Sequence, residues 1–233
     1  MSVTFLIPIY NEVKTVREAI EETLKIDLPD KEIIIIDNNS SDGSKKIIEE
    51  YQNTQNLKII YQAKNYGFGN SIQDGFSNSS KDFVYIQYGD LEYDIDKSIE
   101  MLDLIKEKNL DVIFASRLKN INSTKEILRK IINKPSYLAT LLCTFLVNWF
   151  YRKKFTDIIG TKLYRRKSIE PIVPKVSGQG FDFEFVSLIC KNKLKVEEVF
   201  INYTPRENNS DKKIKFYHLF NAIYAIFKVK FFL

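Results

Sequence analysis

The sequence alternates apolar runs of strand length with amphipathic helical patterns. Five apolar runs rich in β-branched and aromatic residues occur in the first half, and the segments between them repeat apolar side chains at helical spacing. Such alternation is typical of βαβ units, which build a mostly parallel sheet with right-handed crossovers. We therefore expect an α/β fold. The expected strands are Val3–Pro8, Glu32–Asp37, Leu57–Tyr61, Phe83–Tyr88 and Asp111–Ser116, and the expected helices cover roughly 14–25, 43–53, 69–79 and 95–108.

Polar or glycine-containing segments follow all five expected strands. In open parallel sheets, ligands bind outside the carboxyl ends of the strands. Since these ends lie at one edge of the sheet, we expect the segments to converge on one crevice and to form a binding site there. They are residues 8–12, 37–43, 65–70, 88–94 and 116–117.

Three carboxylates, Asp90, Glu92 and Asp94, follow the fourth strand within five residues. Carboxylates crowded at the end of a strand repel one another unless a cation lies among them. Hard oxygen ligands on a short loop suit Mg²⁺ or Mn²⁺, which bind one or two carboxylates together with the phosphates of a ligand. A solvated acidic turn is the alternative interpretation.

The glycine-containing loop after the third strand does not indicate a nicotinamide dehydrogenase. Gly67 and Gly69 are spaced as in a dinucleotide fingerprint, but the third glycine position is Ile72, and the loop follows the third strand rather than the first. Gly67 and Gly69 instead fit a tight strand-to-helix turn with close backbone approach.

Length and composition indicate a globular protein whose partners carry phosphate. The 233 residues are 44% hydrophobic, enough for one large core or for a domain with an appendage. Cys143 and Cys190 lack metal or redox spacing and are predicted to be buried thiols, and the N-terminal apolar run lacks the features of a signal peptide. Residues 191–233 carry nine Lys/Arg and four Asp/Glu, so the net charge of +5 lies in this tail. This basic tail favours a nucleotide or an anionic lipid as partner, because no nucleic-acid-binding motif accompanies it.

Two apolar segments of the second half predict amphipathic helices. Residues 127–156 contain six Lys/Arg and no acid, and the 17 residues at 135–151 are uncharged. That length is at the lower limit for a membrane span, and a single crossing would separate Arg117 from the segment after residue 157. We expect a helix that packs on the domain or lies at a lipid surface, with an ordinary core helix as the alternative. Phe216–Leu233 admits the same two interpretations.

Taken together, the motifs resemble those of family 2 glycosyltransferases, most of all dolichol-phosphate mannose synthases and related polyprenyl-phosphate glycosyltransferases. The resemblance extends over nearly the whole chain, with the loops in the same order. The matching stretches are VTFLIPIYNE at 3–12, IDNNSSDGS at 36–44, the N-x-G-x-G start at 65–75, QYGDLEYD at 87–94, ASR at 115–117, the D-x-x-x-G-x-K segment at 157–166, YTPR at 203–206 and KKI at 212–214.

This resemblance implies a GT-A fold, in which helices flank a Rossmann-like, mostly parallel sheet and amphipathic helices lie toward the C-terminus. Residues 1–118 would bind the nucleotide-sugar, and residues 119–233 of the same domain would bind the acceptor. The implied reaction is metal-dependent, inverting hexosyl transfer from a nucleoside-diphosphate sugar to a polyprenyl phosphate, such as dolichyl or undecaprenyl phosphate. A saccharide hydroxyl as acceptor and a catalytically degenerate nucleotide-sugar-binding protein are the alternatives. The layout also implies a peripheral position on the cytoplasmic face of a membrane, and leaves open a membrane-protein partner or a homodimer.

The resemblance also assigns residues to the nucleotide-sugar, with two departures from the family pattern. Tyr88 replaces the first aspartate of the metal loop, and Asn38 replaces an aspartate of the base-reading loop. The Asn38 amide can still accept a hydrogen bond from a base. The nucleotide-sugar-binding residues are predicted to be Pro8, Tyr10, Glu12, Asp37, Asn38, Asn65, Gly67, Tyr88 and Gly89.

The remaining site residues carry charge. Asp90 and Glu92 are predicted to hold Mg²⁺ or Mn²⁺, and Asp182 or Glu184 would act as the base if the acceptor is a hydroxyl. The lone histidine, His218, lies in an aromatic stretch and is expected to be structural. The predicted catalytic residues are Asp90, Arg117, Asp182 and Glu184, and the predicted contacts to acceptor phosphate are Arg117, Arg129, Arg206, Lys212 and Lys213.

Overall fold

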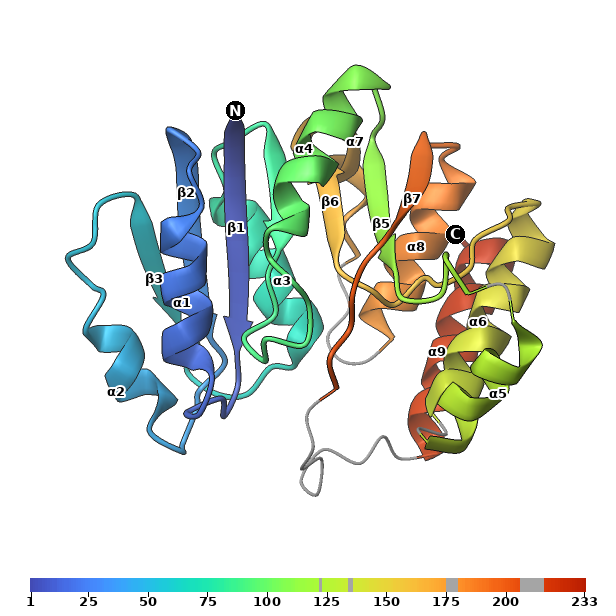
Figure 1. Cartoon of the computed structure of the whole chain (residues 1–233), viewed down its shortest axis with the longest axis horizontal. Helices are drawn as coiled ribbons and strands as arrows, with labels where there is room; N and C mark the ends of the chain where they lie inside the picture. Colours follow the sequence, from blue (N-terminus) through green and yellow to red (C-terminus); the bar gives the residue numbers. More distant parts are fainter. Residues whose placement is uncertain (122, 134–135, 175–179, 206–215) are drawn as a thin grey trace.

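In the computed structural model, the described residues form an α/β structure around one central sheet (Figure 1). The structure describes residues 1–121, 123–133, 136–174, 180–205 and 216–233. Within these, the sheet has seven strands in the order β3-β2-β1-β4-β6-β5-β7. The strands are β1 Ser2–Ile9, β2 Asp30–Asp37, β3 Leu57–Tyr61, β4 Phe83–Ile86, β5 Val112–Ser116, β6 Lys162–Arg165 and β7 Val196–Phe200.

All strands run in one direction except β6, which is antiparallel to both β4 and β5. The α/β prediction is confirmed, and each of the five predicted strands is present. Strand β4 ends at Ile86 rather than Tyr88, so that Gln87 and Tyr88 belong to the loop. Two strands, β6 and β7, were not predicted, because one has four residues and the other has two glutamates at its centre.

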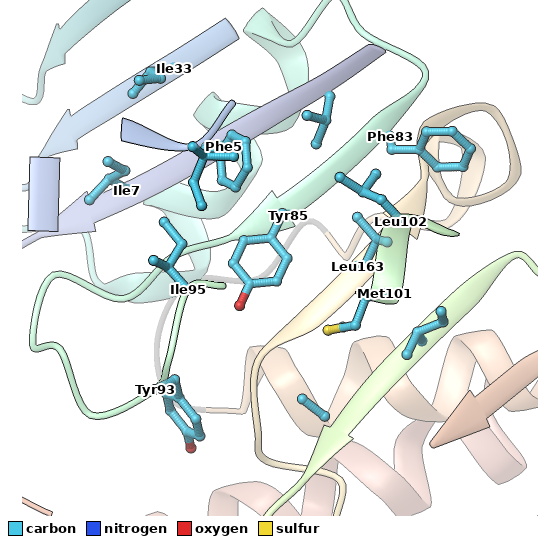
Figure 2. Packing of buried hydrophobic residues seen from close by; sticks show 14 of the residues in the cluster. Phe5, Ile7, Ile33, Phe83, Tyr85, Tyr93, Ile95, Met101, Leu102 and Leu163 are labelled. Atoms are coloured by element: carbon cyan, nitrogen blue, oxygen red, sulfur yellow. The ribbon is translucent and has the colours of Figure 1, made fainter. Parts of the chain in front are cut away.

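Helices cover both faces of the sheet, and the side chains of the strands alternate between them. Phe5 and Ile7 point to a core under α1 and α4, in which Phe5 packs edge-on against Tyr85 (Figure 2). Leu6 points to the other core, under α3 and α8. The helices are α1 Val16–Lys25, α2 Ser44–Glu49, α3 Phe68–Asn78, α4 Lys97–Glu107, α5 Thr124–Asn133, α6 Ser136–Tyr151, α7 Arg166–Ile169, the 3-10 helix η1 Glu170–Ile172, α8 Phe181–Lys191 and α9 Phe216–Phe231.

The segment that the sequence predicts as amphipathic over 135–151 forms α6, which packs against α8 and α9 on one side of the sheet (Figure 1). Cys143 and Val147 are buried in this packing, whereas Phe145 and Trp149 are exposed. Among the described helices, none is long and apolar enough to cross a membrane. The helix therefore has one face in the core and one outside it.

Gly160 allows the close approach of two strands at the edge where the predicted loops gather. A Cβ added to Gly160 would overlap the carbonyl oxygen of Ala115 in β5. The next residue bonds to the same strand, because the Ala115 N–H donates to the Thr161 carbonyl at 2.9 Å. A side chain at residue 160 would therefore force apart β5 and the entry to β6.

We expect Gly160→Ala to lower the free energy of unfolding by about 3 kcal/mol or more, because the clash is with backbone and cannot be relieved by a rotamer change. Gly180→Ala is the matched control, since its added Cβ would meet Ala225 and Asn221 at 3.5 Å, which is ordinary contact. Urea unfolding followed by circular dichroism measures both. Equal stability of the two variants would contradict this account of β5 and β6.

Candidate active site

A pocket of about 450 Å³ opens at the carboxyl edge of the sheet, between the loop after β4 and helices α6, α8 and α9. The predicted metal ligands Asp90 and Glu92 line it, together with Arg117 after β5 and Asp182 at the start of α8. These residues come from distant parts of the chain. The structure thus brings together four charged residues that the sequence analysis singled out.

The backbone of the acidic loop turns sharply between the two predicted metal ligands. Leu91 has a φ of 57°, in the left-handed region that is uncommon for a residue with a side chain. The Glu92 N–H donates to the Asp90 carboxylate at 3.3 Å, and the Tyr203 hydroxyl donates to the Glu92 carboxylate at 2.8 Å. The turn directs both carboxylates toward the pocket, and Tyr203 holds the second in place.

Gly89 seats this loop against the loop that follows β1. A Cβ added to Gly89 would overlap the side chain of Ile9, and the Thr15 hydroxyl donates to the Gly89 carbonyl at 2.7 Å. The loops after β1 and β4 therefore touch, as expected for neighbouring parallel strands.

The third carboxylate of the loop has a different environment. Asp94 lines a separate cavity of about 630 Å³ beside α1 and α4, where Glu22 and Asp96 also lie. Burial, together with the nearby carboxylates, raises the pKa of Glu22. Among the described residues, no group of three or more His, Cys, Asp or Glu side chains is arranged to hold a metal ion. Asp90 and Glu92 would thus need a ligand's oxygens to complete a coordination sphere.

Tyr88 forms part of the pocket wall. Its ring stacks on Phe68 with ring centroids 5.8 Å apart and planes at 8°. The ring of Tyr93 lies against it as well, with ring centroids 5.6 Å apart. Burial, and then the charge of Asp182, raise the pKa of Tyr88 well above its usual value. Tyr88, which replaces a family aspartate, is therefore a neutral aromatic side chain beside the predicted base Asp182.

Asn38 links the loop after β2 to the loop after β3. Its amide donates to the Asn65 side chain at 3.0 Å and accepts from the Tyr66 N–H at 2.9 Å. Asn65 in turn accepts from the N–H of Gly67, which has a φ of 88°. A carboxylate at residue 38 has no proton to donate to Asn65. The asparagine at residue 38 thus makes a hydrogen bond to Asn65 that the aspartate of the family pattern could not donate.

The remaining predicted nucleotide-sugar residues lie along the same edge, beside the pocket rather than in its wall. Asp37 ends β2 and accepts from the Ser40 N–H at 3.1 Å. The buried Glu12 donates its N–H to Ser44 at 2.8 Å, which ties the loops after β1 and β2 together. Pro8 lies in β1, and Tyr10 is 39% exposed.

Arg117 forms a buried ion pair with Asp157. Its guanidinium donates to the Asp157 carboxylate at 2.6 and 3.0 Å, and the rings of Tyr137 and Tyr203 lie 5.0 and 5.2 Å from it. Burial opposes both charges, but the pair outweighs burial, so the pKa of Arg117 is raised and that of Asp157 is lowered. The Arg117 fork is therefore directed at Asp157, and its predicted phosphate contact would use its remaining N–H groups.

The two candidate bases point in different directions, because residues two apart on a helix lie on opposite sides. Asp182 lines the pocket and accepts from the Lys162 ammonium at 3.4 Å. Glu184 is buried and pairs with Lys228 of α9 at 3.2 Å. Glu184 therefore faces Lys228 rather than the pocket, and Asp182 is the base candidate that lines the pocket.

Three residues of this site have no separate role in the sequence analysis. Asp157 and Lys162 lie in a segment noted only for its resemblance to a family motif, although a charged residue within a largely apolar segment is a signal of a buried partner. His218, expected to be structural, lines the pocket from α9. A lone histidine in an aromatic helix carries no signal of this position.

The other predicted phosphate contacts lie away from the pocket wall or outside the described residues. Arg129 is exposed on α5. Arg206, Lys212 and Lys213 lie in the segment 206–215, which is outside the described residues.

A comparison with models of known protein families identifies the family of the chain. The model for "Glycosyl transferase family 2" matches residues 4–173, which is most of the chain. The chain therefore belongs to glycosyl transferase family 2.

Curated relatives share part of their length with it. A poly-beta-1,6-N-acetyl-D-glucosamine synthase of Staphylococcus epidermidis is 31% identical over 129 residues, which cover 55% of this chain and 31% of the relative. A cholesterol galactosyltransferase of Borreliella burgdorferi is 30% identical over 217 residues, covering 86% of this chain and 58% of the relative. The chain thus spans less than two thirds of either.

Solved structures confirm the GT-A fold predicted from the resemblance. S. aureus TarS 1-349 in complex with UDP-GlcNAc has a TM-score of 0.67 at 18% identity, covering 97% of this chain and 65% of TarS. M. tuberculosis glucosyl-3-phosphoglycerate synthase in complex with Mn²⁺, UDP and glucosyl-3-phosphoglycerate has a TM-score of 0.67 at 12% identity, covering 98% and 80%. The narrower resemblance to dolichol-phosphate mannose synthases stays a prediction.

We expect Asp157→Asn to lower the free energy of unfolding by about 3 kcal/mol, because it leaves Arg117 buried without a counter-charge. The Asp157 carboxyl has a lower pKa in the folded chain than in the unfolded chain, so its stabilisation is complete above pH 4 or so and is lost as the pH falls through the folded pKa. In Asp157→Asn, the free energy of unfolding should therefore also fall less steeply at acid pH than in the unmodified chain.

Asp30→Asn is the control, since Asp30 forms an exposed ion pair with Lys81. Its effect should be small. Unfolding in urea between pH 3 and pH 7 measures both variants, and an unchanged acid dependence in Asp157→Asn would contradict the assignment.

Proposed function

We propose that the chain transfers a sugar from a nucleoside-diphosphate sugar to an acceptor bound in the 450 Å³ pocket. The observation that carries this proposal is the joint placement of Asp90, Glu92 and Asp182 around one cavity at the carboxyl edge. The relatives support it, because they are named as a polysaccharide synthase and a galactosyltransferase, and TarS was solved with UDP-GlcNAc.

The donor set of the pocket fits a divalent metal that the diphosphate helps to hold. Mg²⁺ and Mn²⁺ are commonly bound by one or two carboxylates together with substrate phosphates, and Asp90 and Glu92 provide two. Mn²⁺ is present in the complexes of the Pyrobaculum calidifontis mannosyltransferase and of the M. tuberculosis synthase. When bound, such a metal would neutralise negative charge that develops on the diphosphate leaving group.

The nucleotide would lie along the edge next to this pocket. Asp37 and the Asn38–Asn65 amide pair would contact the base and ribose, since Asp37 ends β2 and the amide pair joins the loops that follow β2 and β3. Pro8, Tyr10, Glu12, Gly67 and Gly89 would shape this side by holding the neighbouring loops together.

The reaction would be a direct displacement. An acceptor oxygen forms the new bond to the anomeric carbon while the bond from that carbon to the diphosphate breaks, which inverts the configuration. A polyprenyl phosphate is already an anionic nucleophile and needs only positioning. A saccharide hydroxyl must lose its proton, and Asp182, held beside the Lys162 ammonium, would accept it.

The pocket wall favours an acceptor with an apolar part. Ala139 and Cys143 of α6 and Leu219 and Ala222 of α9 line the pocket. Burial raises the pKa of Cys143 to about 12, so its thiol is neutral at physiological pH. A polyprenyl phosphate combines an apolar chain with a charged nucleophile. It is therefore the leading candidate, with the saccharide hydroxyl second.

We expect Asp90→Ala to reduce turnover of the nucleotide-sugar by about a hundredfold or more, because it removes a carboxylate from the leaving-group side of the pocket. Asp94→Ala is the matched control, since this carboxylate of the same loop lines the other cavity. Release of nucleoside diphosphate from a panel of nucleotide-sugars with Mn²⁺ measures both. Metal-dependent binding without turnover in the unmodified chain would instead support a degenerate binding protein.

Asp182→Asn separates the two acceptor classes. Transfer to a hydroxyl should fall by about 10²- to 10⁴-fold without the base, whereas transfer to a lipid phosphate should change by less than about tenfold. Glu184→Gln is the control, because Glu184 faces Lys228 outside the pocket. The assay follows labelled sugar on a short polyprenyl phosphate and on saccharide acceptors. Loss of transfer to the lipid phosphate in Asp182→Asn would contradict the positioning mechanism.

A further inference from the structure

Helices α6 and α9 each expose a stripe of large apolar side chains. On α6 these are Leu138, Leu142, Phe145 and Trp149, which are 61%, 40%, 63% and 66% exposed. On α9 they are Phe220, Tyr224, Phe227 and Phe231, which are 60%, 68%, 37% and 59% exposed. Both stripes have the spacing of residues that share one face of a helix. We call these eight residues the α6–α9 face.

The two stripes join into one surface. Trp149 stacks on Phe150 at 5.0 Å, and Phe150 contacts Phe227 and Phe231 of α9 at 5.0 and 5.7 Å. Figure 1 shows α6 and α9 side by side at the edge of the molecule, with α5 next to them. Tyr61 and Ile99 are exposed on other elements, and Leu128 and Ile132 are exposed on α5. A joined apolar surface of this kind marks an interaction site.

The surroundings of this face are basic. Helix α6 contains no charged residue, and α9 contains no acid and two lysines, Lys230 and Lys228, of which Lys228 pairs with Glu184 of α8. Arg152, Lys153 and Lys154 follow α6 directly. Tryptophan and tyrosine within an apolar surface with lysine and arginine at its rim are typical of segments that lie in the headgroup region of a bilayer.

We propose that the α6–α9 face docks on an anionic lipid surface, with its apolar side chains among the acyl chains and its basic rim among the headgroups. A second copy of the chain is a poorer occupant, because a two-fold interface would place each basic rim against another. The occupant is a surface rather than a spanned bilayer, since no described helix is long enough to cross one.

This docking would bring the pocket to the lipid. The buried sides of the same two helices line the pocket, with Thr140 and Cys143 from α6 and His218 and Ala222 from α9. A lipid-linked acceptor could then enter between the helices without leaving the bilayer entirely. That consequence rests on the proposed function, whereas docking itself does not.

The test is sedimentation of the full chain with vesicles of phosphatidylcholine, alone or with phosphatidylglycerol. We expect binding to the anionic vesicles that weakens with salt. The double variant Phe145→Ser and Trp149→Ser should bind at least about tenfold more weakly, because it removes two exposed aromatic side chains from the surface. Ile99→Ser is the control and should bind as the unmodified chain does, since the exposed Ile99 lies on α4 and lines the cavity beside α1.

The charge of the rim is tested separately. Arg152→Glu with Lys154→Glu should weaken binding to anionic vesicles by about fivefold or more per residue, with little change on neutral vesicles. Equal binding to neutral and anionic vesicles, or no vesicle binding, would overturn the proposal. A dimer in analytical ultracentrifugation that the Phe145→Ser and Trp149→Ser variant dissolves would also overturn it, in favour of a second copy.

The vesicle assay does not depend on catalysis. Hydrolysis of a soluble nucleotide-sugar, measured without vesicles, should be unchanged in the Phe145→Ser and Trp149→Ser variant, because neither residue lines the pocket. Failure of docking and failure of the proposed sugar transfer are therefore told apart by the two measurements.

Discussion

Burial of the central strands on both faces is the constraint on which the rest of the structure depends. β1 and β2 send alternate side chains into two separate cores, so neither strand has a face left for a ligand. Parallel strands buried in this way can present polar groups only where they end. The loops after β1 to β5 therefore gather at one edge, and Asn11, Asn39 and Leu91 adopt left-handed conformations within them.

Charge balance organises the pocket at that edge. Asp90, Glu92 and Asp182 bring three carboxylates to one cavity, and Arg117 and Lys162 are the basic groups beside them. Arg117 is held by the fully buried Asp157, so it serves as a fixed part of the wall as well as a charge. Asp90 and Glu92 provide the oxygen ligands that a divalent cation of the proposed transfer would use.

Local pattern allowed most of the first half to be predicted. Its strands are continuous apolar runs, and its loops carry the acidic and amide side chains that mark the site. The second half was harder, because β6 and β7 are short and charged and pair with strands far away in the chain. Asp182 and Glu184 show the same limit, since these two candidates lie two residues apart on one helix and differ in what packs against each side.

The sequence by itself determined the fold class and the family motifs, and it predicted a site at the carboxyl edge of the sheet, because these follow from hydrophobic periodicity and from short segments of fixed spacing. Tertiary structure alone decided that Arg117 pairs with Asp157, that Glu184 turns away from the pocket and that His218 lines it. It also decided that the stripes of α6 and α9 join into one face. Each of these facts depends on contacts between residues far apart in the chain, and no local pattern encodes them.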